Sequence, residues 1–434
     1  MKLSHVLNSL SASLVQQDWT VEALELHLSQ RLPSKLAKLA HPMALALKQS
    51  FPKGVAPDAA IVARTMAHFP QTKRIWKHVL KTGAVPQIPL APPGFTPNPT
   101  IAHISLPKLT TTDALADWLS ISTDALIRFA DLRCLSALSD NAFGPHYRHH
   151  LLPKRDGSLR LIEEPKPMLK RLQRQILKGL INHIPPHEAA FGYRKGRNCI
   201  QGAARHAGEA VVLGFDLSGF FPSIAFNRAY GIFRTVGYPE GIARSLAGLC
   251  TSITPSALLA TPGLAARDKL AQRHLPQGAP TSPALANLAA FSLDRRLTGL
   301  ARSLGANYSR YADDMAFSGD SRIAPILLRA VPQIIREEGF YPNAAKARLA
   351  RAHDRQTVTG LVINRHVNFN RSDFDLLKAT LHHLADPSDP RRVDPHFLRH
   401  LAGRIGWVEQ INPARGLRLR QLFDQCFHRE PFVG

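Results

Sequence analysis

The residues of this 434-residue chain best suited to chemistry are two adjacent carboxylates, Asp313 and Asp314. They follow Tyr311 and Ala312, and the aromatic and apolar residues around them are typical of a strand, a turn and a second strand. Neighbouring carboxylates in apolar surroundings are costly unless a cation compensates them. Since Mg²⁺ binds one or two carboxylates together with substrate phosphates, the pair could support chemistry on a phosphate. An exposed hairpin turn is the alternative interpretation of these four residues alone.

A third carboxylate, Asp216, ends the apolar run 211–216, where the chain is predicted to turn into a helix. If a neighbouring strand brings it beside the pair, the three side chains complete a site for two magnesium ions. Two such ions lower the pKa of an attacking hydroxyl and stabilise the phosphorus under attack. The alternative role for Asp216 is a helix N-cap, which is compatible with metal binding.

The loop 275–283 is the third element with chemical potential. Its prolines and Gly278 favour a rigid turn, and a helix is predicted to start near Ala284. Such a loop can offer backbone amides and the Gln277 amide to a nucleotide or a template base. On its own it would pass as an ordinary loop.

The elements that must position these residues follow from composition and periodicity. The sequence predicts a mainly helical region 1–81, a proline-rich linker or surface strap 82–100, a helical hairpin 101–140, a mixed region 141–364 and a helical region 365–434. In the first region, helical patterns over 21–31 and 61–81 are interrupted by prolines 33, 42, 52 and 57.

The mixed region carries the predicted strands. A hairpin is expected over 146–162, a helix over 167–182, and further strands over 211–216, 309–316 and 358–363. The run 211–216 lacks alternation, which indicates a strand buried on both faces. Because the strands do not recur in regular βαβ units, the predicted class is α+β.

The charge of the chain points to a polyanionic partner. Lys and Arg number 55 against 32 Asp and Glu, a formal net charge of +23. The basic residues are scattered, which favours a long nucleic-acid channel over a membrane-binding patch, with a solvated basic surface as the alternative. No apolar run reaches the length of a membrane span and no secretory signal is recognisable. The four separated cysteines favour a reducing cytoplasm over zinc or disulfides.

Five ordered motifs together resemble the reverse transcriptase family. Residues 311–314 match its Tyr-x-Asp-Asp box, 215–222 its first palm box, 275–283 its Leu-Pro-Gln-Gly box, 153–160 its fingers hairpin and 191–198 the box that follows. The resemblance covers about 140–365. It implies a right-hand polymerase with fingers and palm in 141–364, a helical thumb in 365–434 and a mainly helical N-terminal extension.

The chain most resembles the bacterial retron group, through Tyr-Ala-Asp-Asp and the triplet Val358-Thr359-Gly360. This implies an RNA-directed DNA polymerase that copies a cognate structured non-coding RNA from dNTPs. It also implies priming from an RNA 2′-OH, a branched RNA–DNA product and antiphage defence with an accessory effector protein. About 70 residues follow Ile363, too few for a thumb and an RNase H domain, so template removal would fall to a host RNase H.

Residue roles follow from the same resemblance. Asp216, Asp313 and Asp314 are expected to be catalytic metal ligands, with the Leu217 carbonyl as a backbone ligand for two Mg²⁺, or Mn²⁺ as a substitute. Phe221 matches the ring that excludes a ribose 2′-OH, with ordinary core packing as the alternative. The other expected nucleotide-binding residues are Lys154 and Arg160, on the triphosphate, and Gln277, beside the nascent base pair.

Nucleic-acid contacts are expected from Arg194, Lys195 and Arg197 along the template and from Val358, Thr359 and Gly360. The candidate surface for recognising the cognate RNA is a set of C-terminal arginines: Arg391, Arg392, Arg399, Arg404, Arg415, Arg418 and Arg420. A solvated face is the alternative there. The histidines 146, 149 and 150 are expected to contact RNA or solvent rather than metal.

Two alternatives remain open from the sequence. The chain lacks the Asn-Ala-x-x-His element that retron enzymes often carry, so another bacterial defence-associated or group II intron-like reverse transcriptase is possible. A catalytically idle nucleic-acid-binding scaffold is the alternative of a different class, and the presence of all three carboxylates argues against it.

Overall fold

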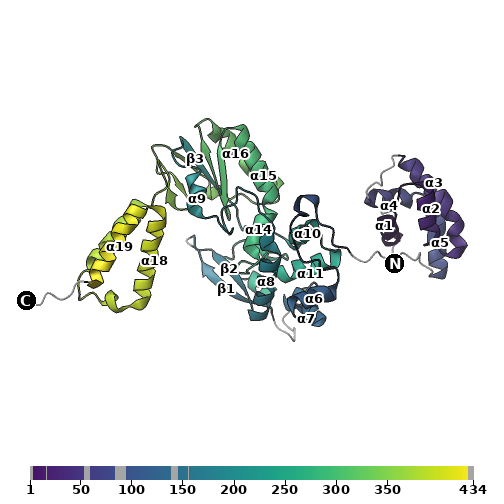
Figure 1. Ribbon diagram of the computed structural model, residues 1–434, viewed down its shortest axis with the longest axis horizontal. Helices are drawn as coiled ribbons and strands as arrows, with labels where there is room; N and C mark the ends of the chain where they lie inside the picture. Colours follow the sequence, from purple (N-terminus) through teal and green to yellow (C-terminus); the bar gives the residue numbers. More distant parts are fainter. Residues whose placement is uncertain are drawn as a thin grey trace, which may run out of the picture. The chain divides into compact units, whose positions relative to one another are not determined.

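The computed structural model describes residues 3–15, 17–52, 59–83, 94–137, 145–154 and 156–428. The chain divides into two compact units, 1–94 and 95–434 (Figure 1). The first unit is helical throughout its described part, and the second combines helices with three antiparallel sheets. Among the described helices, none has the length and apolar character needed to cross a bilayer.

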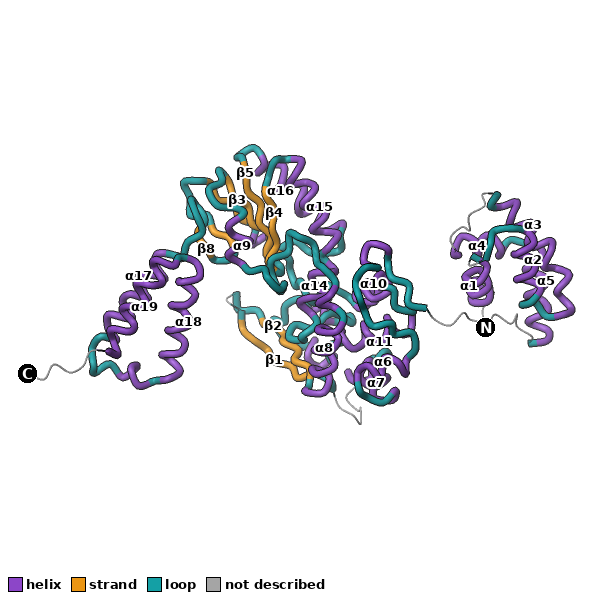
Figure 2. Tube along the Cα trace, in the orientation of Figure 1, coloured by secondary structure: helices purple, strands orange, loops and turns teal. Residues whose placement is uncertain are grey.

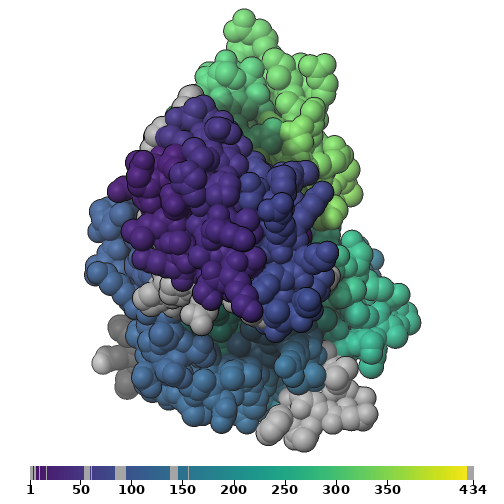
Figure 3. Space-filling view, turned by 90° about the vertical axis from the view of Figure 1, so that its right-hand side faces the viewer, coloured from purple at the N-terminus to yellow at the C-terminus, as the bar shows by residue number. Residues whose placement is uncertain are grey.

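The first unit has a core of its own, with Leu24, Met43 and Leu47 fully buried. Its elements are α1 Leu3–Leu14, α2 Val21–Ser29, the 3₁₀ helix η1 Ser34–Leu39, α3 Ala40–Ser50, α4 Ala59–Ala67 and α5 Pro70–Thr82. In the space-filling view of Figure 3, the described atoms at the purple end of the colour bar, which belong to this unit, form one compact body.

Prolines act differently from their predicted role in this unit. The helical pattern over 61–81 is divided at Pro70, which begins α5. The prediction that Pro42 interrupts a helix is wrong, because Pro42 lies in the first turn of α3. A proline there costs no hydrogen bond, since the first-turn N–H groups have no partner within the helix. Pro57 and residues 84–93 of the predicted linker lie outside the described residues.

The second unit begins by packing against α10 Phe226–Val236 and the turn that ends it. The Phe95 ring lies 5.0 Å from that of Tyr238, and the Thr96 N–H donates to the Gly237 carbonyl at 3.0 Å. The short 3₁₀ helix η2 Pro99–Ile101 follows. Residues 95–101 are therefore a strap on this unit.

A hairpin and a group of helices come next (Figure 2). Strands β1 Tyr147–Pro153 and β2 Leu159–Pro165 pair antiparallel, as predicted, around a turn in which Gly157 has a φ of +79°. Helices α6 Thr112–Leu119 and α7 Thr123–Ala130 are capped by Thr111 and Ser122. They pack with α8 Pro167–Gly179 and α11 Glu240–Cys250 in the main core.

The central sheet has the order β4-β5-β3-β6 and is antiparallel throughout. Its strands are β3 Val211–Asp216, β4 Asn307–Tyr311, β5 Asp314–Gly319 and β6 Arg348–Arg351. Leu213 and Phe215 face the core shared with α15 Phe291–Ser303 and α16 Ile323–Glu337, whereas Val212 packs toward α9 Cys199–Ala204 (Figures 1 and 2). Strand β3 is thus buried on both faces, as its sequence predicted.

Two stretches predicted as strands are hairpins. The stretch 309–316 contains the turn between β4 and β5, which agrees with the strand, turn and second strand expected around Asp313 and Asp314. The stretch 358–363 spans β7 Thr357–Val358 and β8 Leu361–Val362, joined by Thr359 and Gly360 with φ values of +49° and +82°. A run of β-branched residues hid this turn, because only Gly360 signals it locally.

The rest of the unit comprises short connecting elements and a C-terminal group of three helices. The short connecting elements are η3 Leu135–Ala137, η4 Ile181–His183, α12 Ser256–Leu259, α13 Arg267–Leu270, α14 Ser282–Ala289, η5 Ala344–Lys346 and η6 Pro390–Val393. Helices α17 Arg371–Leu384, α18 Pro395–Ile411 and α19 Pro413–His428 share a core that includes Leu381, Ile405 and Leu419.

Candidate active site

The register of the central sheet places Asp216 directly opposite Asp314, at the end where β3 and β5 pair. The Leu217 N–H donates to the Asp313 carbonyl at 3.0 Å, which ties the end of β3 to the turn between β4 and β5. The three predicted carboxylates therefore lie at one end of one sheet. Asp216 is nearly buried, with 5% of its surface exposed.

The turn that carries Asp313 is held by a buried arginine. Ala312 has a φ of +57°, a conformation that costs a non-glycine residue energy. The fully buried Arg310 donates to the Ala312 carbonyl at 3.0 Å and to the Asn287 Oδ1 at 3.0 Å. It also forms a two-pronged ion pair with Asp294, at 2.8 and 2.7 Å.

The same network reaches the loop before α9. The Asn287 amide donates to the Gly192 carbonyl at 2.8 Å. A Cβ atom at position 192 would lie 2.8 Å from the Ala312 nitrogen, so only glycine allows this approach. Two helices and a loop thus fix the catalytic turn through Arg310. The sequence alone did not predict that Arg310 supports this turn. The feature that could have indicated it is an arginine directly before Tyr311.

Burial and mutual repulsion raise the pKa values of two of the carboxylates, Asp313 and Asp314. Burial, together with the charges of Asp216 and Asp314, raises the pKa of Asp313 above its usual value. The pKa of Asp314 is likewise raised by burial and by Asp216, against the opposing charge of Arg348. The site therefore holds more negative charge than its surroundings compensate.

Two groups that the sequence did not single out bind Asp216. The Lys346 ammonium donates to its Oδ2 at 2.9 Å, and the Asn343 amide donates to its Oδ1 at 2.9 Å. The hydrogen bond to Asp216 raises the pKa of Lys346. The sequence feature that could have revealed these partners is Asn343-Ala-Ala-Lys346. It lies just before β6, and β6 pairs with β3, the strand that ends at Asp216.

The donor set suits a hard divalent cation, because three acidic side chains at one end of the sheet all offer oxygen ligands. Within the described ranges, no group of three His, Cys, Asp or Glu side chains is already gathered as a cation site. Each Asp216 oxygen accepts one hydrogen bond and keeps a second lone pair, so a cation could bind there beside Lys346 or in its place. The residues therefore fit the expected metal.

The predicted loop 275–283 is fixed to the β1–β2 hairpin. The Glu163 N–H donates to the Gln277 carbonyl at 2.8 Å. Gly278 has a φ of +132°, and a Cβ atom there would lie 2.9 Å from the Glu163 carbonyl oxygen. Only glycine fits this contact, so the position of Gln277 is set by strand β2.

Comparison with known proteins identifies the family. Residues 152–365 match the family described as reverse transcriptase (RNA-dependent DNA polymerase). The chain is 38% identical over 320 residues to the retron Mx65 reverse transcriptase of Myxococcus xanthus, covering 74% of this chain and 72% of that protein. It is 35% identical over 328 residues to the retron Mx162 enzyme of the same organism (72% and 66%) and 31% identical over 242 residues to the retron Ec86 enzyme of Escherichia coli (55% and 70%).

The chain belongs to the retron-type reverse transcriptases. It is an RNA-directed DNA polymerase with the α+β fold of a right-hand polymerase. The assignment of the β1–β2 hairpin to the fingers, the central sheet to the palm and α17–α19 to the thumb stays a prediction. The resemblance drawn from the five motifs is confirmed.

An aromatic group lies beside the catalytic turn of this reverse transcriptase. The Tyr193 ring lies 6.3 Å from that of Phe221 and 6.3 Å from that of Tyr311. Phe221 also contacts Phe220, with ring centres 5.6 Å apart. Tyr193 is half exposed and has a φ of +57°. The predicted gate residue is thus connected to the Tyr-Ala-Asp-Asp turn through Tyr193.

The predicted basic template residues lie in the same neighbourhood. Arg194, Lys195 and Arg197 line a pocket of about 560 Å³ together with Tyr193 and Tyr311. The Arg197 guanidinium stacks on the Phe191 ring at 4.9 Å, which orients it.

Lys154 and Arg160 lie on the fingers hairpin, away from these contacts. Arg160 is exposed and pairs with Leu152 in the register of β1 and β2. In the described part of the chain, neither side chain has a hydrogen bond or ion pair to the palm carboxylates. The structure therefore does not place Lys154 and Arg160 in contact with the three candidate carboxylates.

The triplet Val358-Thr359-Gly360 lies next to the catalytic hairpin. Val358 and Thr359 line a small cavity with Tyr311, Asp314 and Arg348. Val358 is 4% exposed and packs in the core, so its side chain is unavailable to nucleic acid. Thr359 and Gly360, at the turn, remain accessible.

The three fingers histidines serve the local structure. His146 contacts the Arg128 carbonyl at 2.9 Å, His149 lies 3.9 Å from Glu163, and His150 lies 3.7 Å from Glu164. These partners belong to the same part of the fold.

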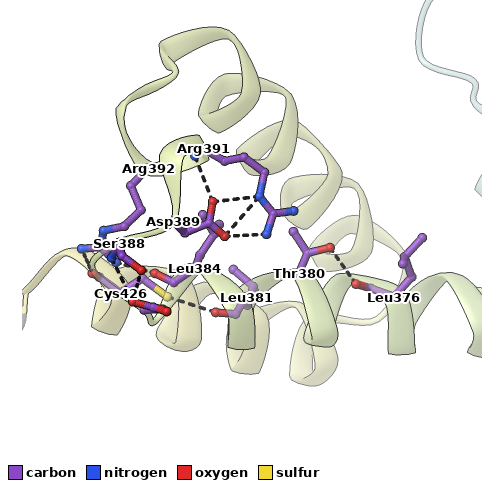
Figure 4. A network of polar contacts seen from close by, with 10 residues as sticks. Leu376, Thr380, Leu381, Leu384, Ser388, Asp389, Arg391, Arg392 and Cys426 are labelled. Atoms are coloured by element: carbon purple, nitrogen blue, oxygen red, sulfur yellow. Dashed lines mark hydrogen bonds and ion pairs between the residues drawn. The ribbon is translucent and has the colours of Figure 1, made fainter.

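Several predicted RNA-binding arginines stabilise the thumb instead (Figure 4). Arg391 pairs with Asp389, and Arg392 donates to the Leu384 and Cys426 carbonyls, which ties α17 to α19. Two more have side-chain partners: Arg415 donates to Asn368, and Arg420 pairs with Glu409. The remaining three, Arg399, Arg404 and Arg418, are at least partly exposed, and Arg399 donates to the Pro395 carbonyl at 3.1 Å.

Proposed function

We propose that this reverse transcriptase copies part of a cognate structured non-coding RNA, starting from a 2′-OH of that RNA. The product is a branched RNA–DNA molecule, made in the cytoplasm as part of an antiphage defence system with an accessory effector protein. The main support is the register that places Asp216 opposite Asp314 beside Asp313, in a chain similar to retron enzymes.

Asp216, Asp313, Asp314 and the Leu217 carbonyl would hold two Mg²⁺ ions, or Mn²⁺ as a substitute. Bound ions of this kind lower the pKa of the attacking hydroxyl and stabilise the charge on the transferring phosphate. Lys346, which donates to Asp216, would offer a positive group for phosphates beside the ions. Arg310 keeps the turn, and hence Asp313, in place throughout.

Substrate selection falls to residues around this centre. The Phe221 ring, flanked by Tyr193, excludes a ribose 2′-OH and so favours dNTPs. Gln277, whose loop is hydrogen-bonded to strand β2, lies beside the nascent base pair. Lys154 and Arg160 bind the triphosphate from the fingers. The described contacts leave the exposed Arg160 free for this role.

Arg194, Lys195 and Arg197 guide the template by phosphate contacts, which are independent of sequence. Recognition of the cognate RNA falls to Arg399, Arg404 and Arg418, which are at least partly exposed, and to the turn at Thr359 and Gly360. A host RNase H removes the copied RNA.

Sequencing the nucleic acid that co-purifies with the protein tests this proposal. The expected result is a short DNA joined to one RNA species, released as linear DNA by an enzyme that cleaves 2′,5′-phosphodiester bonds. Protein carrying Asp313→Asn and Asp314→Asn should hold the same RNA without DNA. Linear DNA on many unrelated RNAs would contradict the retron assignment and favour another type of bacterial reverse transcriptase.

A further inference from the structure

Helix α5, in the N-terminal unit, presents an exposed basic face. Lys73, Lys77 and Lys81 follow each other at intervals of four residues, so they lie on one side of the helix, one turn apart. Arg74 extends the same side, and all four side chains are exposed. The face therefore concentrates four positive charges on a helix of 13 residues.

The charges on this face oppose one another. Like charges four residues apart destabilise a helix, and α5 contains two such lysine pairs and no Asp or Glu. Across the described ranges, none of the four has an ion pair with an acidic side chain. Residues 1–94 hold eleven Lys and Arg against four Asp and Glu, a formal net charge of +7. An external polyanion is the natural compensation.

The opposite side of α5 argues against a membrane as the polyanion. Thr72, Ile75 and Val79 are buried, and Ile75 and Val79 belong to the unit's own core. An amphipathic helix that lies on a lipid surface binds by inserting its apolar face among the lipids. In α5 these apolar residues pack inside the protein, so a nucleic-acid backbone fits the basic face better than a lipid surface does.

We propose that the α5 face, defined by Lys73, Arg74, Lys77 and Lys81, binds the phosphate backbone of the structured RNA as a second contact. This rests on the proposed function, which supplies an RNA long enough to reach two sites. The reverse transcriptase family match covers 152–365 and leaves this unit unexplained. Two contacts from one chain strengthen binding of a long RNA but add nothing for a short primer–template.

The test uses the full chain with Lys73→Gln, Lys77→Gln and Lys81→Gln, because Gln removes the charge and keeps helix propensity. The matched control is Lys35→Gln, Lys38→Gln and Lys108→Gln, which removes three exposed lysines elsewhere. The probe is a long fluorescein-labelled RNA hairpin, titrated between about 50 and 200 mM salt.

The α5 variant should lower the slope of log affinity against log salt by about 2 to 3, and weaken binding about tenfold or more at physiological salt. The control should change the slope by less than about 1. Equal effects from the two variants, or no change in slope, would overturn the proposal. Binding of wild type to phosphatidylglycerol vesicles, lost in the α5 variant while RNA binding stays, would also overturn it.

Primer extension on a short primer–template separates this proposal from the function on which it rests. The α5 variant should retain wild-type activity there, because no catalytic residue has changed. If wild type binds the hairpin through α5 but yields no branched product in cells, the proposed function fails and the α5 contact stands. If the branched product forms and the slope does not change, the α5 contact alone fails.

Discussion

The Nε2 atom of His274 lies 2.7 Å from Oε2 of Glu163, and both side chains are almost completely buried. The other ring nitrogen of His274 faces the Gln272 carbonyl at 2.6 Å. Both ring nitrogens thus have an oxygen within hydrogen-bond distance, which fixes the orientation of the buried ring. This pair joins fingers strand β2 to the residue just before the Leu-Pro-Gln-Gly loop.

Replacing Glu163 with Gln should destabilise the protein and displace Gln277. The Glu163 oxygens contact His274 and accept from the Thr254 hydroxyl, and Gln keeps only one of these oxygens, so one buried polar group loses its partner at a cost of about 1 to 3 kcal/mol. The matched control is Glu164→Gln on the same strand, whose pair with Lys170 is solvent-exposed and contributes at most about 1 kcal/mol. Unfolding midpoints and the KM for dNTPs measure both effects. Equal behaviour of the two variants would show that the buried pair has no special role.

Replacing Arg310 with Lys should lower kcat by about tenfold or more with little change in the KM for dNTPs. Lysine keeps the charge opposite Asp294 but cannot also bond the Ala312 and Asn287 oxygens. The turn that carries Asp313 then loses its support. The control is Arg296→Lys, at a partly exposed ion pair with Glu337 and Glu338. A folded Arg310→Lys protein with wild-type kcat would refute the positioning role.

His206 should remain neutral at pH 5.5. It lies between the Ser318 and Ser309 hydroxyls, 2.8 Å from each, and burial lowers its pKa to about 4. The unfolded chain binds this proton near pH 6.5, so stability is present above that pH and is lost as the pH falls toward 4. The total effect is about 3 kcal/mol. NMR titration of labelled histidines measures the protonation, and a His206 signal that titrates near pH 6.5 would contradict the expectation.

Replacing Phe221 with Val should raise the use of ribonucleotides relative to deoxynucleotides. The smaller side chain opens space for a 2′-OH between Tyr193 and the catalytic turn. The ratio of kcat/KM values for the two substrates is the readout. Phe220→Val, at the buried neighbouring ring, is the control and should alter stability more than the ratio. An unchanged ratio in an active Phe221→Val enzyme would assign the ring to packing.

Local patterns were sufficient to predict the β1–β2 hairpin, the buried strand β3 and the turn between two strands that carries the candidate carboxylates. Asp313 and Asp314 stand out because acidic pairs are rare among aromatic residues, and the strand before Asp216 lacks alternation. These signals span a few residues each.

Contacts between distant residues were beyond such reasoning. Lys346 meets Asp216 across 130 positions, and Arg310 gains its role only when α14 and α15 pack beside β4. In the same way, no local feature of the sequence shows that Arg392 connects α17 to α19 by hydrogen bonds and does not bind RNA. The turn at Thr359 was missed because threonine and valine usually favour strands.

DNA synthesis on an RNA template by Asp313→Asn and Asp314→Asn proteins tests the central claim most directly. The control is Asp320→Asn, an exposed carboxylate at the end of the same hairpin that pairs with Arg322. Primer extension and RNA affinity are measured on the same preparations. The account predicts that each catalytic variant loses about a thousandfold or more in rate while binding RNA normally, and that Asp320→Asn stays active. DNA synthesis at the wild-type rate by either catalytic variant would contradict it.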